Sequence, residues 1–413
     1  MHNIELFMEK CTFSENIFTQ PSLYEEFNIY LFPERRINIY DIVYFKNKII
    51  SKINNDIYYE HRGRLDTNLF YYPGYYISKR PLFPIVFFLK VKEFSDKLSI
   101  LLFECLCYHL IKELNYGVFI NHSEFKKNIL TEEILCSCIN YLYAGIKYSE
   151  KEFERVFNYE ISGNHFRKYI KYEETRKPEF LSILFTDLNN FLKYFLIDER
   201  YMEEFANVAI ELIGNACEHT KTDCLFDIDI ADNYKKKDKN GEFRGKYYAV
   251  NISIVNFSNK LFYYDIRDKI KILSNVNNLS NRYKLLLNAF NNHKMFFNDE
   301  YKEDYFYLIS AFQDKISGSM EKNVTGGTGL KKLIQSLQRE SDTSMCYMQT
   351  GDIVFYFVDK YLNYNADNWL GFNNENDFFN KPPSRHIFDK SKVFIPGTAY
   401  NLTFVYERKI ENV

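Results

Sequence analysis

The sequence predicts an α+β protein with two domains, and three stretches lead to this expectation. Apolar residues recur at helical spacing across Phe205–Thr220. The segments Leu225–Ile230 and Tyr247–Val255 have the alternating and continuous apolar patterns that are typical of strands. Nearer the N-terminus, Pro84–Asn121 reads as a strand, a helix and a second strand, which form one β-α-β unit. A length of 413 residues also favours more than one domain.

Composition and charge argue against some classes of function. The formal net charge is −2, so nothing in the chain as a whole indicates binding to nucleic acid or to an anionic membrane surface. No segment is apolar over the about 18 residues that a membrane span needs. The first residues, Met1–Glu5, do not resemble a signal peptide. We therefore expect a cytoplasmic protein that does not associate with a membrane.

The first 165 residues contain no motif with a recognisable chemistry. Short aromatic and β-branched runs across Phe13–Tyr76 predict strands and loops, followed by the β-α-β unit within Pro84–Asn121. The patterns at Ile129–Tyr148 and Glu150–Tyr159 predict helices. Residues 1–165 are thus expected to be a small α/β domain of unknown role. Its alternation of elements resembles the STAS-like domains, by analogy of pattern alone.

Cysteines offer a candidate metal site in this part of the chain. Cys105 and Cys107 form one Cys-x-Cys pair with His109 nearby, and Cys136 and Cys138 form another. Four thiolates would suit a zinc-dependent regulator. However, both pairs lie in apolar runs of helical pattern, where residues two apart point to nearly opposite sides, and zinc motifs usually place Cys-x-x-Cys in a turn. We therefore favour buried free thiols.

Basic residues mark the expected boundary between the domains. They cluster at Arg167–Lys171 and again at Arg176-Lys177, which indicates a solvated linker over residues 166–180. Beyond it, Leu181–Tyr194 has helical periodicity and is expected to pack beside the helix Phe205–Thr220.

The helix Phe205–Thr220 carries a carboxylate and an amide on one face. Glu211 and Asn215 are four residues apart, so they lie one turn from each other. A carboxylate can accept a proton from water, and an amide oxygen is a suitable ligand for Mg²⁺. A surface helix with two unrelated polar residues is the alternative.

A glycine-rich turn provides a second candidate site. Thr325–Leu330 reads Thr-Gly-Gly-Thr-Gly-Leu and is followed at once by the amphipathic helical pattern Lys331–Leu337. Glycines that open a helix let backbone N–H groups approach an anion closely, and the helix dipole favours negative charge there. This turn is therefore expected to bind phosphate.

The order of these stretches, an E-x-x-x-N helix, strands, a long segment and then G-G-T-G-L, resembles the ATP-binding domain of the GHKL superfamily. That superfamily includes gyrase, the heat-shock chaperones of ninety kilodaltons, histidine kinases and mismatch-repair ATPases. The form E-x-x-x-N-A-x-x-H looks most like the anti-sigma-factor serine kinases. The resemblance implies a two-layer α/β sandwich of Bergerat type over residues 181–408, with a mixed sheet covered by helices. It also implies Asn215 as the Mg²⁺ ligand, Glu211 as the catalytic base, and phosphate contacts from Gly326, Gly327, Thr328, Gly329 and Leu330.

The adenine part of the motif departs from the family. Members usually carry D-x-G-x-G after the strand, whereas this chain has Asn256, Ser258 and Lys260 at the three fixed positions. The amide oxygen of Asn256 can still accept from the adenine amine, more weakly than a carboxylate. Ser258 would lie beside the base, and Thr398 in the last strand would line the adenine pocket. We expect that ATP binding is retained, the alternative being a weak nucleotide sensor that does not hydrolyse.

The resemblance places a lid over the phosphates at residues 260–324, and here this interval has helical patterns. A helical insertion packed on the edge of the domain is the alternative to a lid.

The remaining expected elements are helices at Leu261–Leu273, Asn281–Phe290 and Tyr301–Ser317, a polar turn at Asn233–Gly245, a hairpin about Gly351 across Ser344–Val358, a loop at Tyr361–Lys392 and a strand at Gly397–Tyr406.

These features lead to three hypotheses for function. The first is an ATP-binding protein, a slow Mg²⁺-dependent ATPase whose lid closure switches contacts with a partner or with its own N-terminal domain. The second is a serine/threonine protein kinase of the anti-sigma-factor type, and the third is a non-hydrolysing interaction module that senses nucleotides. A histidine kinase is disfavoured, because the nearest candidate for the phosphate acceptor, His122, lacks the proline that usually follows in a helical hairpin. The superfamily often dimerises, so a homodimer is also expected.

Overall fold

The structure, a computed structural model, describes residues 3–13, 29–33, 35–56, 84–89, 94–122, 137–143, 148–195, 197–218, 220–234, 247–274, 279–317, 329–340 and 346–407. It is a mixed α/β protein whose chain divides into two compact units. The first unit comprises Met1–Tyr169 with Asp227–Ala231 and Lys392–Phe394, and the second comprises Ile170–Phe226, Asp232–Ser391 and Ile395–Val413.

A parallel sheet lies in the first unit, in the order β2-β3-β4. Strand β3 (Ile85–Leu89) leads through helix α3 (Lys97–Lys112) into β4 (Val118–His122), and β3 and β4 pair in parallel. This confirms the predicted β-α-β unit. Strand β2 (Ile29–Leu31) pairs in parallel with the other side of β3.

Helices α1 (Asn3–Lys10) and α4 (Glu150–Asn158) also belong to this unit, and α4 confirms the helix predicted there. The expectation of strands and loops across residues 13–76 is wrong for α2, a helix of 18 residues at Ile39–Asp56. Ile42, Phe45 and Ile49 recur at helical spacing and are buried, so tertiary packing overrides their preference for strands. The described part of the predicted helix at residues 129–148 holds a short 3₁₀ helix (η4, Cys138–Leu142) in place of an α-helix.

Strand β6 (His165–Ile170) lies where a solvated linker was expected, and it pairs antiparallel with β5 (Tyr159–Ser162). Arg167 is only 1% exposed. Its guanidinium pairs with Asp227 and Glu104, which neutralise the charge that suggested a solvated segment.

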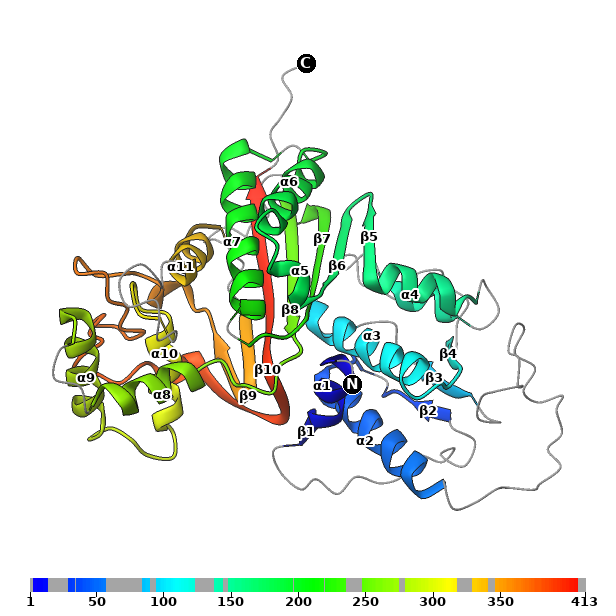
Figure 1. The fold of residues 1–413 in the computed structure, drawn as a ribbon, viewed down its shortest axis with the longest axis horizontal. Coiled ribbons are helices and arrows are strands. Elements are labelled where there is room, and N and C mark those ends of the chain that lie inside the picture. The colour runs from blue at the N-terminus through cyan, green and yellow to red at the C-terminus, as the bar shows by residue number, and fades with distance from the viewer. Residues whose placement is uncertain are drawn as a thin grey trace, which may run out of the picture. The chain divides into compact units, whose positions relative to one another are not determined.

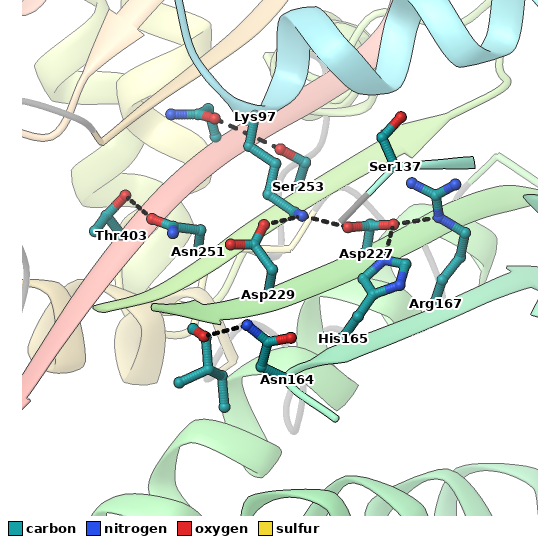
Figure 2. Close-up of polar contacts among 12 residues, drawn as sticks. Lys97, Ser137, Asn164, His165, Arg167, Asp227, Asp229, Asn251, Ser253 and Thr403 are labelled. Atoms are coloured by element: carbon teal, nitrogen blue, oxygen red, sulfur yellow. Dashed lines mark hydrogen bonds and ion pairs between the residues drawn. The ribbon is translucent and has the colours of Figure 1, made fainter. Parts of the chain in front are cut away.

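These residues belong to a buried ionic network within the first unit. Figure 2 shows Asp227 between Lys97 on one side and Arg167 and His165 on the other. Lys97 also pairs with Asp229. Burial alone would raise the pKa of Asp227, but the charges of Arg167, Lys97 and His165 hold it well below its usual range.

The same network explains a difference in β7 (Cys224–Tyr234). Its alternating sequence predicts a half-buried strand, yet Asp227 and Asp229 are as fully buried as the apolar residues between them. Their paired charges take the place of contact with water, so polar residues occupy a buried face.

A seven-stranded sheet has the order β1-β10-β8-β7-β6-β5, with β9 also pairing β10. In the second unit, α6 and α7 lie side by side over β8 and β10 (Figure 1), and the ring of Phe205 in α7 packs edge-on against Phe404, with 5.8 Å between centroids. This confirms the predicted packing of the two helices. The bounds are β1 Thr12–Phe13, α5 Tyr172–Thr175, α6 Phe180–Leu192, α7 Glu199–Glu218, β8 Tyr247–Asn256, β9 Tyr347–Tyr356 and β10 Phe388–Glu407.

The prediction of a hairpin about Gly351 is wrong. Strand β9 runs straight through this glycine, and residues on both sides of it pair with β10. Gly351 has a φ of +62°, and the register shifts beside it. The extra residues at both register shifts lie in β10, and Gly351 pairs with Ile395 between the two shifts, so its positive φ belongs to an irregular point of the pairing and not to a turn. Strand β10 begins at Phe388, within the segment that was expected to be a loop.

The three helical patterns expected in the interval 260–324 are confirmed as α8 (Tyr264–Leu273), α9 (Asn281–His293) and α10 (Glu303–Ala311). Arg282 in α9 donates to the carbonyls of Asp314 and Asn368, and its guanidinium lies 3.5 Å from the centre of the Trp369 ring. Phe312 stacks on Phe355 of β9 at 5.1 Å. These contacts pack the interval against β9 and the segment that follows it.

No described helix is long and apolar enough to cross a membrane. Of the polar turn expected at Asn233–Gly245, residues 235–245 lie outside the part of the chain that the structure describes.

Candidate functional site

A pocket in the second unit is lined by residues from α7, β8, β10, α11 (Gly329–Glu340) and the interval between β8 and α11. The space between these residues is about 960 Å³, including the open mouth. The polar lining residues are Glu211, Asn215, Thr220, Asn256, Lys260, Asp265, Ser317 and Thr398, and the apolar ones are Leu212, Ala216, Ile254, Leu261, Phe262, Ile266, Ala311, Ile316, Leu330 and Tyr400.

The structure brings together five of the residues that the sequence singled out. Glu211, Asn215, Asn256, Leu330 and Thr398 all line this pocket. Ser258 is not among its lining residues. Gly329 is the first residue of α11, whereas Gly326, Gly327 and Thr328 lie outside the described residues.

Glu211 and Asn215 lie one turn apart on the pocket side of α7. The Asn215 Nδ2 is 3.5 Å from the Glu211 Oε1, and both side chains are half-buried. On the other side of the helix, Ile213 is fully buried. Because the amide nitrogen is turned toward the carboxylate, Oδ1 is the atom of Asn215 that is left to ligate a cation.

Asn256, at the end of β8, has its amide held in one orientation. Its Nδ2 donates to the carbonyl of Ala216 and to the Thr220 Oγ1, the second at 3.0 Å. The Thr222 Oγ1 donates to the Asn256 Oδ1 at 3.3 Å. An amide oxygen has two lone pairs, so the Asn256 Oδ1 can accept one further hydrogen bond.

Strand β10 approaches Asn256 closely. Thr398 of β10 is the register partner of Asn256 in β8. It follows Gly397, which has a φ of +78°. A Cβ atom at Gly397 would lie 2.7 Å from the Asn256 carbonyl oxygen and 2.9 Å from that of Ser258. Glycine is therefore required here on two grounds, conformation and space.

Two charged residues that sequence reasoning did not assign to the site also line the pocket. The Lys260 ammonium pairs with the carboxylate of Asp265 in the first turn of α8. Ser258 accepts the Lys260 backbone N–H at 2.8 Å through its hydroxyl, so Ser258 shapes the turn that carries Lys260. The departure from the family's glycine at residue 260 was visible in the sequence, but the partner across the turn was not.

The described chain on each side of the glycine-rich turn also reaches the pocket. Ser317 and Leu330 both line it, and the Lys331 ammonium lies 3.4 Å from the Asp314 carboxylate. The Lys269 Nζ donates to the Ser317 carbonyl at 2.8 Å and to the hydroxyl of Tyr283 at 2.7 Å. Burial lowers the pKa of Lys269 to about 8.

The cysteines considered as zinc ligands are buried. Cys105, Cys107 and Cys138 are free thiols with no exposed surface, and burial raises the pKa of each well above its usual range. This confirms buried thiols at these three positions, and Cys136 lies outside the described residues. Within the described ranges, no group of three or more His, Cys, Asp or Glu side chains is arranged to hold a metal ion.

Comparisons with protein-family models, with curated proteins and with solved structures find no match to this chain, so the ligand of this pocket is inferred from its residues.

Proposed function

We propose that this pocket binds ATP with Mg²⁺ and hydrolyses it slowly, and that the second unit is a Bergerat-type domain of the GHKL superfamily. One observation carries the proposal: Glu211, Asn215, Asn256, Leu330 and Thr398 belong to four elements far apart in sequence, yet they line a single pocket. Unrelated polar residues on α7 and β8 and the first turn of α11 would have no reason to meet at one pocket.

The wall beside Asn256 suits a flat base. Ile254, Leu261, Ile266 and Tyr400 provide apolar surface there, as sites for aromatic ligands do. The remaining acceptor position of the Asn256 Oδ1 would take the exocyclic amine of adenine, and the partners of its Nδ2 fix the oxygen in place.

The wall formed by α7 suits the phosphates. Mg²⁺, when bound, would neutralise charge on the phosphate oxygens. The Oδ1 of Asn215 would hold that ion, and the carboxylate of Glu211 would orient a water molecule and accept its proton. The sequence Gly326–Gly329 would add backbone donors, a role that rests on its composition and on the positions of Ser317 and Leu330. Positioning and neutralised charge provide most of the catalysis in phosphoryl transfer.

The helical interval would act as a wall of this site. Its residues Phe312 and Arg282 are packed against β9 and the segment that follows, and closing it as a lid would break those contacts. Switching of a partner by nucleotide remains a prediction.

The test is ATP binding by titration calorimetry, with and without Mg²⁺, together with phosphate release. Asn215→Ala should lose the Mg²⁺ dependence of binding. Glu211→Gln should keep binding but lose about 100-fold or more in phosphate release, as for removal of a general base. Helix α7 supplies a matched control, because Glu203 and Asn207 have the same E-x-x-x-N spacing two turns earlier and do not line the pocket. Glu203→Gln and Asn207→Ala should change neither property.

An unchanged Mg²⁺ dependence in Asn215→Ala would overturn the assignment of that residue, and no ATP binding by the wild type would overturn the function. Tight binding without release would favour the sensing module. Labelled phosphate that appears on a second protein would favour the kinase.

A further inference from the structure

We propose that Lys260 exchanges its partner Asp265 for a phosphate of the bound nucleotide, and that this exchange makes the site prefer nucleoside di- and triphosphates over adenosine. The inference deepens the proposed function and rests on it. The observation behind it is the Lys260–Asp265 ion pair on the pocket wall, at a position where the related family has glycine.

The backbone under Lys260 is fixed. Its N–H donates to the Ser258 hydroxyl at 2.8 Å, and Ser258 is buried. The long side chain therefore starts from a defined point beside the pocket, and its flexible stem can turn from one acceptor to another without movement of the chain.

The charged side chains on the pocket wall are mostly acidic, so a bound triphosphate needs a cation to offset the repulsion. Among the described residues that line it, Glu211 and Asp265 are acidic and Lys260 alone is basic. A triphosphate placed between two carboxylates is repelled, and Mg²⁺ at Asn215 would offset only part of that repulsion. The Lys260 ammonium, once released from Asp265, would offset a further part of the repulsion between the carboxylates and the triphosphate.

The pair itself is easy to exchange. The side chains of Lys260 and Asp265 are 40% and 26% exposed, so water and salt weaken their attraction. Asp265 lies in the first turn of α8, where the helix dipole stabilises a carboxylate without Lys260. A phosphate carries more negative charge than a carboxylate, so it is the stronger partner for the ammonium.

The experiment measures dissociation constants of the full-length protein for ATP, ADP and adenosine at two salt concentrations. Lys260→Met should weaken ATP and ADP binding about tenfold, the loss expected for one charge-assisted hydrogen bond, and leave adenosine binding within a factor of about two. The variant should also show a smaller effect of salt on ATP binding. Lys260→Arg should restore most of the affinity. Asp265→Asn should tighten ATP binding a few-fold, because the ammonium is no longer held. Lys332→Met, at an exposed position of α11, is the control for a change of net charge.

Four outcomes would overturn the inference. Equal ATP affinity in Lys260→Met and the wild type would show that the ammonium does not reach the phosphates, while the proposed function would stand. A parallel loss of adenosine binding would show that Lys260 only shapes the pocket. Weaker ATP binding in Asp265→Asn would show that the intact pair is needed. A wild type that binds none of the three ligands would overturn the proposed function together with this inference.

Discussion

At the scale of single residues, Asn256 shows that a substituted motif position can be suited to its surroundings. The GHKL motif that the sequence resembles has Asp at this position, but the Asn256 Nδ2 donates to the Ala216 carbonyl, which a carboxylate cannot do. The amide is therefore matched to the end of α7, and the departure from the family motif need not mean that adenine binding is lost.

We predict that Asn256→Asp weakens ATP binding, although it restores the family's residue. A carboxylate oxygen would face the carbonyl oxygen of Ala216 in place of a donor, and the lost hydrogen bond costs about 1–3 kcal/mol even though the Thr220 hydroxyl still donates to that carbonyl. Titration with ATP should show about a tenfold loss of affinity or more, and urea unfolding should show lower stability. Asn207→Asp, the same change at another position of α7, is the control. Tighter ATP binding in Asn256→Asp would contradict this reading of the Asn256 contacts.

At the scale of elements, the helical interval positions the pocket through its ends. Ser317, which lines the pocket, is held by Lys269 of α8 and by Tyr283 of α9, whose hydroxyl accepts the Ser317 N–H at 3.3 Å. Two helices thus fix the residue from which the chain continues toward the glycine-rich turn.

We predict that Lys269→Met weakens ATP binding several-fold without removing a residue of the pocket wall. It also changes the pH dependence of stability. The folded pKa of Lys269 is about 8, below its usual value, so the unfolded chain binds more protons between about pH 8 and 10.5. The wild type should therefore gain up to about 3 kcal/mol relative to Lys269→Met as pH rises through this window, because each pKa unit corresponds to about 1.4 kcal/mol. Denaturant unfolding at pH 7 and pH 10 measures the difference.

Lys271→Met is the matched control, because Lys271 is exposed on the same helix. A constant difference in stability between wild type and Lys269→Met across this pH range would show that burial of the ammonium is not linked to folding.

At the scale of the whole molecule, each of the two units has its own polar organisation. The second unit has Glu211, Asn215, Asn256 and Lys260 around a pocket, whereas the first holds Lys97, Arg167, Asp227 and Asp229 in a network with almost no exposure. A buried network of this kind stabilises only while all its members are present, because removal of one leaves the others charged and unpaired.

We predict that Asp227→Asn lowers the stability of the first unit by about 3–5 kcal/mol, as loss of one partner of a buried ion pair does. The pKa of Asp227 is held far below its usual value, so its contribution is present above about pH 4 and is lost as pH falls further. The stability of the variant should depend less on acid pH than that of the wild type.

Hydrogen exchange in α3 reports on the first unit, and fluorescence of Trp369, the single tryptophan, reports on the second. Asp232→Asn, exposed on the same strand, is the control. Equal protection of the α3 amides from hydrogen exchange in Asp227→Asn and Asp232→Asn would contradict the prediction.

The sequence by itself determined the elements whose signal is local. Helical spacing placed Glu211 and Asn215 on one face of α7, and apolar patterns located the β-α-β unit and the three helices between β8 and α11. Periodicity reports which side of an element is buried, and that information is contained in a few consecutive turns.

Only the tertiary structure decided which charges are neutralised and which elements meet. The sequence alone made Arg167 look solvated and Gly351 look like the turn of a hairpin, and it gave no indication that Asp265 faces Lys260. The partners of these residues lie on other elements or across a turn. A buried charge becomes tolerable, and a glycine is kept inside a strand, only through contacts that the local pattern does not contain.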